Sequence, residues 1–171
     1  MSVVRCLSIR QPWCWAILSA GKRIENRSRA DGRMPSLCSY RGPLLIHASA
    51  GCTKREHGEA SAWMVAKGLA TWELLHASLP YVPHLTLTPR GGIVGVCNVV
   101  AFIGPDGFLQ GFESPSGWDK AKTVDKRWHI AGSYGLVLAD VRPLPFTPFK
   151  GALGFFDVPD DIALPLIGGD Q

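Results

Sequence analysis

The stretch VVRCLSIRQPWCWAILSAGKRIENR (residues 3–27) decides the fold. Residues 3–9 are predicted to form a strand, because apolar and branched residues recur along them. Pro12 suits the first turn of a helix, and the apolar residues after it continue as far as Gly21, which ends the helix. Residues 22–27, which follow the helix, are expected to form a second strand. The stretch therefore predicts a strand, a short helix and a second strand in succession.

Working outward, further strands are expected at 44–48, 93–102, 134–138 and 154–158. Apolar residues at helical spacing predict helical structure over 54–79, with a break at Gly68. The polar, glycine-rich residues 104–127 indicate a segment that runs over the surface. Five or six strands with few helices and few βαβ signals favour an α+β fold, a small β-barrel with peripheral helices. We expect one domain over residues 1–171, with insertions at about 54–90 and 104–127.

The composition excludes several classes of protein. Hydrophobic residues make up 46% of the chain and charged residues 19%, which is enough apolar content to build a core. No apolar run approaches the roughly 20 residues of a membrane span, and the amino terminus lacks the long hydrophobic stretch of a secretory signal. The sequence therefore predicts a soluble, cytoplasmic protein without a membrane partner.

Positive charge is concentrated near the amino terminus. The formal net charge is +4. Residues 1–41 contain only Glu25 and Asp31 as acidic residues, against these cations: Arg5, Arg10, Lys22, Arg23, Arg27, Arg29, Arg33 and Arg41. This asymmetry indicates a polyanionic partner such as nucleic acid. Ordinary scatter of surface charge is the alternative.

The five cysteines are odd in number and widely spaced, which favours reduced thiols over a disulfide framework. A zinc ion could be held only by the scattered set Cys38, His47, Cys52 and His57, without any close Cys-x-x-Cys pair, so no metal is expected. The chain also lacks a phosphate-binding Gly-x-x-x-x-Gly-Lys loop, a dinucleotide fingerprint and a serine-nucleophile elbow. No cofactor is predicted.

Several motifs occur in a familiar order. LSIRQPW (7–13) leads into GKRIENR (21–27) and YRGPLLIHAS (40–49), and GGIVG (91–95), GLVL (135–138), KG (150–151) and FDVP (156–159) follow. Together they resemble the ASCH (activating signal cointegrator homology) family. Its hallmark of a lysine, an apolar residue, a glutamate and an arginine is matched by Lys22, Ile24, Glu25 and Arg27. The resemblance implies a PUA-like β-barrel that binds RNA, single-stranded DNA or a modified nucleoside in a cleft.

The motif also makes physical sense without the family. If residues 23–27 are extended, Glu25 and Arg27 share one face and Ile24 occupies the other, with Lys22 at the mouth of the cleft. A carboxylate between two cations stays ionised and could bind a nucleobase edge, while the cations neutralise phosphate. The alternative is a salt bridge that ties the helix to the strand. In a functional cleft, neutralising Lys22 or Glu25 should weaken ligand binding and leave the fold largely intact.

Other candidate ligand-binding residues are polar or aromatic side chains near these motifs. Gln11 and Trp13 lie at the start of the predicted helix, and His47 and Ser49 share one face of a predicted strand. The remaining candidates interrupt an apolar strand or follow the basic run Lys120, Lys122, Lys126 and Arg127: Asn98, Trp128 and Tyr134. For each, a core or solvated structural role is the alternative.

An enzymatic function is a second hypothesis. Some small bacterial ASCH proteins are amidohydrolases of acylated cytidine, with a threonine nucleophile three residues after the motif lysine, and here that position is Glu25. Glu25 could instead activate water while Lys22 stabilises the oxyanion, which makes both candidate catalytic residues. A ribonuclease would draw on Glu25, Lys22 and His47. A protein-interaction adaptor is the third class of function.

Overall fold

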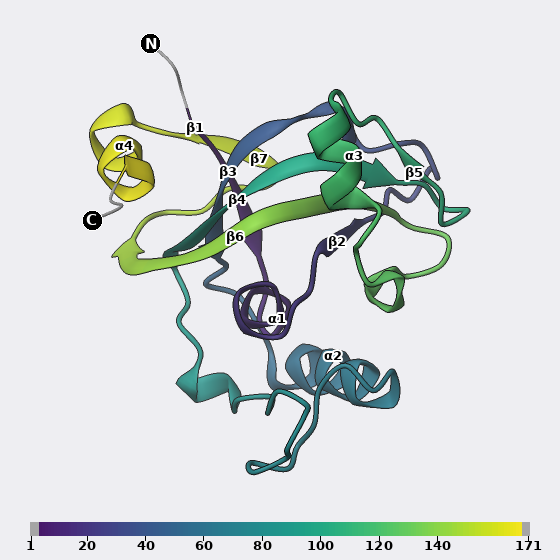
Figure 1. The fold of residues 1–171 in the computed structure, drawn as a ribbon. Helices are drawn as coiled ribbons and strands as arrows, with labels where there is room; N and C mark the ends of the chain where they lie inside the picture. The colour runs from purple at the N-terminus through teal and green to yellow at the C-terminus, as the bar shows by residue number, and fades with distance from the viewer. Residues whose placement is uncertain (1–3, 169–171) are drawn as a thin grey trace.

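A computed structural model of the protein describes residues 4–168 (Figure 1). Seven strands form one sheet: β1 (Val4–Ile9), β2 (Ile24–Arg27), β3 (Gly42–Ala48), β4 (Gly92–Ile103), β5 (Leu109–Gln110), β6 (Tyr134–Pro148) and β7 (Phe155–Val158). Four helices surround it: α1 (Trp13–Ser19), α2 (Lys54–Ala66), α3 (Pro115–Ala121) and α4 (Asp160–Gly168). This confirms the α+β class.

The sheet is an open path of strands in the order β2-β6-β4-β3-β1-β7, with β5 paired to β4. β1 and β3 run parallel, and the other pairings are antiparallel. Among residues 4–168 no pairing joins β2 to β7, so the expected closed barrel is not confirmed. Arg27 of β2 and Phe155 of β7 instead line a common cavity of about 740 Å³, which lies between the two edges.

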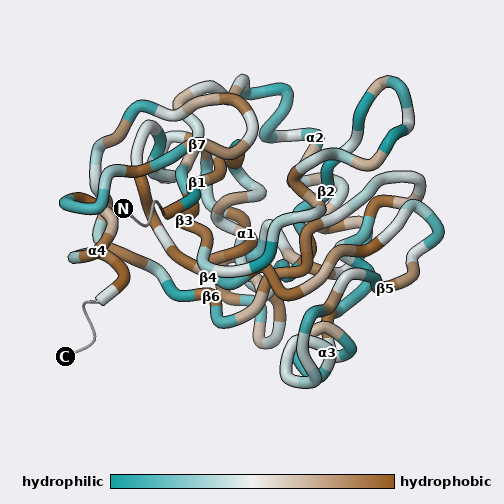
Figure 2. Tube along the Cα trace, turned by 90° about the horizontal axis from the view of Figure 1, so that it is seen from above, coloured by the Kyte–Doolittle hydropathy of each residue, from teal (hydrophilic) through white to brown (hydrophobic). Residues whose placement is uncertain are grey.

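The core lies on the central strands, where apolar residues concentrate in β3, β4 and β6 (Figure 2). Helix α1 packs closely against this sheet because β4 has a glycine at the contact. A Cβ atom built on Gly95 would lie 2.6 Å from Leu18 Cδ2 and 3.1 Å from the carbonyl oxygen of Arg142. Only a residue without a side chain allows this approach.

The first predicted strand, helix and second strand correspond to β1, α1 and β2, with Pro12 directly before α1. The predicted helical segment over 54–79 ends early, however. Helix α2 stops at Ala66, Gly68 adopts a φ of 64°, and the following residues are irregular. Leu69 and Ala70 are buried in the core, but Trp72, Leu74 and Leu75 are exposed, Leu75 by 95%. The apolar spacing beyond Ala70 therefore does not mark the buried face of a helix.

The carboxyl end differs from the prediction in the length of one strand and in an additional helix. The strand expected at 134–138 continues to Pro148, because an edge-like stretch containing several prolines still pairs with β4 through register shifts. Helix α4 follows β7 although Pro165 lies inside it. That the segments 54–90 and 104–127 are insertions stays a prediction; Figure 1 shows α2 and the chain after it projecting from the sheet. None of the helices between residues 4 and 168 has the length and apolar content of a bilayer span.

Candidate functional site

The turn between α1 and β2 places the charged motif. Gly21 adopts a φ of 73°, a conformation that glycine tolerates, and the backbone N–H of Lys22 donates to the carbonyl oxygen of Ala16 at 3.0 Å. The Lys22 side chain therefore lies beside α1, with Nζ 5.7 Å from the centre of the Trp13 ring. Only 1% of Lys22 is exposed.

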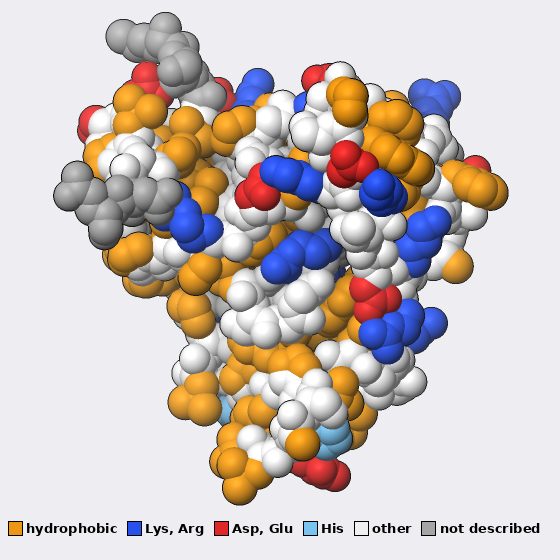
Figure 3. Space-filling model, viewed as in Figure 1, with side chains coloured by type: hydrophobic (Ala, Val, Ile, Leu, Met, Phe, Trp, Pro, Cys, Tyr) orange, Lys and Arg blue, Asp and Glu red, His pale blue; other side chains and the backbone are white. Residues whose placement is uncertain are grey.

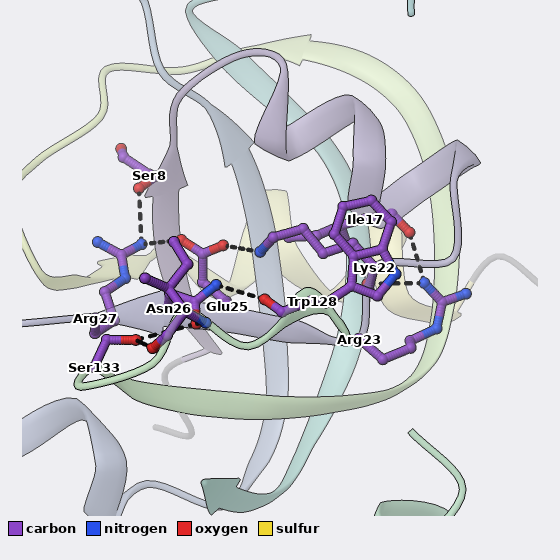
Figure 4. A network of polar contacts seen from close by, with 10 residues as sticks. Ser8, Ile17, Lys22, Arg23, Glu25, Asn26, Arg27, Trp128 and Ser133 are labelled. Atoms are coloured by element: carbon purple, nitrogen blue, oxygen red, sulfur yellow. Dashed lines mark hydrogen bonds and ion pairs between the residues drawn. The ribbon is translucent and has the colours of Figure 1, made fainter. Parts of the chain in front are cut away.

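Three charged side chains lie in a row at this point (Figure 4). Nζ of Lys22 is 2.5 Å from Oε2 of Glu25, and Nη2 of Arg27 is 3.1 Å from Oε1 of the same carboxylate. Arg27 also donates to the carbonyl oxygen of Ser8 at 3.3 Å. Glu25 is 7% exposed, so its charge is balanced by two cations in a mostly buried setting.

The electrostatics keep this group ionised. Burial by itself would raise the pKa of Glu25, but the charges of Lys22 and Arg27 outweigh it and hold the pKa below its usual value. Burial lowers the pKa of Lys22, and the neighbouring Glu25 charge opposes that shift. A carboxylate with a lowered pKa accepts protons poorly, so Glu25 suits hydrogen-bond recognition better than general-base work.

Glu25 and Arg27 form part of the wall of a cavity of about 810 Å³. Five predicted site residues line this cavity together: Trp13, Glu25, Arg27, His47 and Ser49. Lys22 does not line it and lies behind Glu25, in contact with α1. The volume is within the range of about 300–1,000 Å³ that small-ligand pockets occupy.

His47 is 1% exposed and makes two hydrogen bonds. Its Nδ1 is 3.0 Å from Oγ of Ser8, and its Nε2 is 2.9 Å from the carbonyl oxygen of Phe149. The strand β1 pairs in parallel with β3 so that Ser8 lies opposite His47, which brings both side chains to the cavity.

The other predicted ligand-binding residues lie elsewhere. Gln11 is 2% exposed, and its side chain donates to the carbonyl oxygen of Pro89 and accepts from the N–H of Trp15. Asn98 donates to Asp140 at 3.0 Å, beside a separate cavity near α3. The structure therefore gives Gln11 and Asn98 partners within the protein and does not bring them to the large cavity.

The two aromatic candidates at the carboxyl side pack within the fold. Trp128 is 2% exposed and belongs to a core cluster with Ile24 and Met64, so no ring face is free to stack on a base. Tyr134 packs against the core, with its ring centre 6.4 Å from that of Phe102. Neither residue lines the large cavity.

Most of the predicted basic regions are neutralised within the fold. Figure 3 shows cationic and acidic side chains interspersed over the face that carries α3. Three of the four cations in the basic run before Trp128 form ion pairs at 2.6 Å each: Lys120–Asp140, Lys122–Asp119 and Arg127–Asp125. The fourth, Lys126, donates to the carbonyl oxygen of Gly107 at 3.1 Å. In the amino-terminal quarter, Arg5 pairs with Asp157, Arg10 with Glu56, and Arg29 with Asp31. The linear charge asymmetry thus does not become one continuous basic surface.

Several residues that line the cavity were not among the predicted site residues. They are Ser8, Arg10 and a wall formed by residues 149–154, with the exposed Lys150 at its rim. Gly151 contacts the site closely, since a Cβ atom there would lie 2.5 Å from both Ser8 Oγ and His47 Cε1. Lys150 and Gly151 appeared in the sequence only as a family-like motif, because no local pattern places them against β1 and β3.

The cysteines and potential metal ligands do not gather at the cavity. All five cysteines are free thiols, and burial raises the pKa values of Cys6, Cys14 and Cys97 to about 12. Within residues 4–168 no group of three or more histidine, cysteine, aspartate or glutamate side chains could hold a metal ion. The side chains that line the cavity carry charged, hydroxyl, imidazole and aromatic groups.

Comparison with known proteins found a match to one family model. No curated protein matches the chain. The family model described as the ASCH domain matches residues 7–135, which include α1, the charged motif on β2 and His47 on β3. Such a match is consistent with a nucleic-acid-binding module of PUA-like type. Because the match spans well over half of the sequence, the chain belongs to the ASCH domain family.

Proposed function

We propose that the large cavity binds a nucleobase of RNA, single-stranded DNA or a modified nucleoside. The observation that carries this proposal is the Glu25 carboxylate, held between Lys22 and Arg27 at the cavity wall. A carboxylate has about four acceptor positions, and the two ion pairs leave one on each oxygen. Amino and imino groups on a base edge can donate to them.

Two further features suit a nucleotide. Trp13 is partly exposed at the cavity, and the edge-to-face contact with Trp63 (ring centres 5.5 Å apart) fixes its orientation, which favours stacking on a base. Nε of Arg27 is buried and has no acceptor among the described residues. A buried donor without an acceptor costs about 1–3 kcal/mol, so the position of Arg27 beside Glu25 is not explained by internal hydrogen bonding alone.

The rim of the cavity supplies cations for a phosphate group. Lys150 is exposed there and forms no ion pair with a residue of the described chain, while Arg10 pairs with Glu56 at the same opening. Phosphate contacts give affinity without base specificity, whereas the Glu25 carboxylate would read the base. Together they support binding of a nucleotide within a single strand.

The geometry supports ligand binding better than it supports hydrolysis with Glu25 and Lys22 as catalytic residues. Lys22 is buried behind the carboxylate, away from the cavity, where it cannot stabilise an oxyanion on a bound substrate. Its charge instead keeps Glu25 ionised. The pair therefore acts best as a fixed acceptor for ligand hydrogen bonds.

Fluorescence anisotropy with labelled single-stranded RNA and DNA oligonucleotides tests the proposal. We expect micromolar binding that weakens with salt, because phosphate contacts release counterions. Lys150→Gln should reduce the salt slope by about 0.7. Lys122→Gln removes the same charge on the α3 face and should leave binding unchanged. Equal weakening by the two variants, or no binding at low salt, would refute the proposal.

A further inference from the structure

Ser8 and His47 form a hydrogen-bonded pair that nucleobase recognition does not require. Oγ of Ser8 lies 3.0 Å from Nδ1 of His47, and both residues line the large cavity. The pair is held by backbone pairing, since Ser8 on β1 lies opposite His47 on β3 in a parallel register. A serine hydroxyl next to an imidazole nitrogen is the basic arrangement of an activated oxygen nucleophile.

The second hydrogen bond of His47 defines which nitrogen is basic. Nε2 is 2.9 Å from the carbonyl oxygen of Phe149, and a carbonyl can only accept, so Nε2 carries the hydrogen. In a neutral imidazole the lone pair then belongs to Nδ1, which faces Ser8 Oγ. The Phe149 carbonyl thus orients the ring as a carboxylate does in a serine–histidine–aspartate triad, with the two ring nitrogens exchanged.

Two neighbours complete the arrangement. Nη2 of Arg27 donates to the carbonyl oxygen of Ser8 at 3.3 Å, which holds the guanidinium beside the strand residue that carries the hydroxyl. Gly151 packs closely against the pair, because a Cβ atom there would lie 2.5 Å from Ser8 Oγ. A side chain at position 151 would therefore crowd the nucleophile.

We infer that Ser8 is a catalytic nucleophile for acyl transfer from a carboxylic ester, such as an acyl group on a ligand hydroxyl. Oγ forms a bond to the ester carbon as its proton passes to Nδ1 of His47. The tetrahedral oxyanion then collapses, the C–O bond to the alcohol breaks, and the alcohol leaves with the proton from His47. Water, deprotonated by His47, next attacks the acyl-Ser8 ester, releases the carboxylic acid and returns the proton to Ser8.

An ester fits this pair better than an amide. His47 is the one proton carrier hydrogen-bonded to Ser8 in the described chain. An ester alcohol leaves as an alkoxide more easily than an amide nitrogen leaves as an amide anion, so an ester depends less on complete protonation of the leaving group. The inference does not rest on nucleic-acid binding, because the hydroxyl and imidazole react with any ester that enters the cavity. The two proposals can therefore fail separately.

Labelling of the full chain with a fluorophosphonate, which reacts with activated serines by loss of fluoride, tests the inference. Peptide mass mapping should place one adduct on Ser8. Ser8→Ala should abolish it, and His47→Gln should slow it on the order of 100-fold or more, the usual contribution of a general base. Ser116→Ala, which removes an exposed hydroxyl beside Ser114 on the α3 face, is the matched control and should label as the wild type does.

Gly151→Ala provides a second test that leaves both reacting residues in place. Its methyl group would crowd Ser8 Oγ and His47, so labelling should again slow by tenfold or more. Absence of an adduct on Ser8 in the folded wild type, under conditions that label a known serine esterase, would overturn the inference. So would labelling at the wild-type rate in His47→Gln or Gly151→Ala. Oligonucleotide binding by Ser8→Ala, measured in parallel, reports on the proposed binding function alone.

Discussion

Replacing Lys22 by methionine should destabilise the protein strongly. The substitution keeps an unbranched side chain in a position that is 1% exposed but removes the cation 2.5 Å from Glu25. The carboxylate is then buried with only Arg27 beside it. Breaking a buried ion pair by removing one partner costs about 3–5 kcal/mol. This is a large part of the roughly 5–15 kcal/mol by which a domain is stable.

A matched control exists on α3. Lys122 and Asp119 form a pair with the same three-residue separation, at 2.6 Å, but their side chains are 49% and 63% exposed. Lys122→Met should therefore lower the free energy of unfolding by only about 0–1 kcal/mol. The double variant Lys22→Met/Glu25→Leu should lose less than Lys22→Met alone, because no unpaired carboxylate stays buried.

Urea denaturation followed by tryptophan fluorescence and far-ultraviolet circular dichroism measures these differences at constant m value. If Lys22→Met and Lys122→Met lost the same free energy of unfolding, within 1 kcal/mol, the argument from burial would be refuted. The expectation from sequence was that neutralising Lys22 leaves the fold largely intact. That expectation assumed an accessible ion pair, whereas the structure places the pair in the interior.

Three further outcomes follow from the structure. The pKa of Glu25 is lowered in the folded protein. The ionised carboxylate therefore stabilises the fold above its ordinary pKa of 4.5, and this contribution is lost as the pH falls through the lower pKa of the folded state. Urea titrations should show that the difference in free energy of unfolding between the wild type and Glu25→Gln shrinks below pH 4.5. Gly95→Ala should lower the free energy of unfolding by about 1–3 kcal/mol, because its Cβ atom collides with Leu18, and thermal melts will show it. Trp128→Phe should lower the melting temperature through a core cavity yet leave oligonucleotide affinity of the folded protein unchanged; a tenfold loss of affinity would place Trp128 at the ligand.

The sequence was most informative where neighbouring residues determine the structure. The proline before α1, the glycine after it and the alternation along β2 correctly predicted a helix followed by a strand with Glu25 and Arg27 close together. Those features depend on local backbone preferences and on the two-residue period of a strand. They also bring Lys22 next to Glu25.

Features that depend on distant parts of the chain could not be predicted in this way. The burial of Lys22 follows from the packing of α1 against the sheet, and the pairing of acidic partners with the basic run depends on residues such as Asp140. The exposed apolar residues around Leu75 also have the spacing of a helix face, although the segment is irregular. A sequence pattern shows the spacing at which apolar residues recur, but it does not show which residues from distant parts of the chain will be in contact.

The wall at residues 149–154 lies outside the part of the chain that the family model matches. The family match ends at residue 135, whereas the carbonyl of Phe149, the rim cation Lys150 and the close approach of Gly151 complete the cavity from beyond it. Residues 149–154 thus form part of the cavity wall without belonging to the strand that carries Glu25 and Arg27. Under the proposed function, exchange of residues 149–154 would change the ligand contacts at the rim and leave Glu25 and Arg27 on β2 in place.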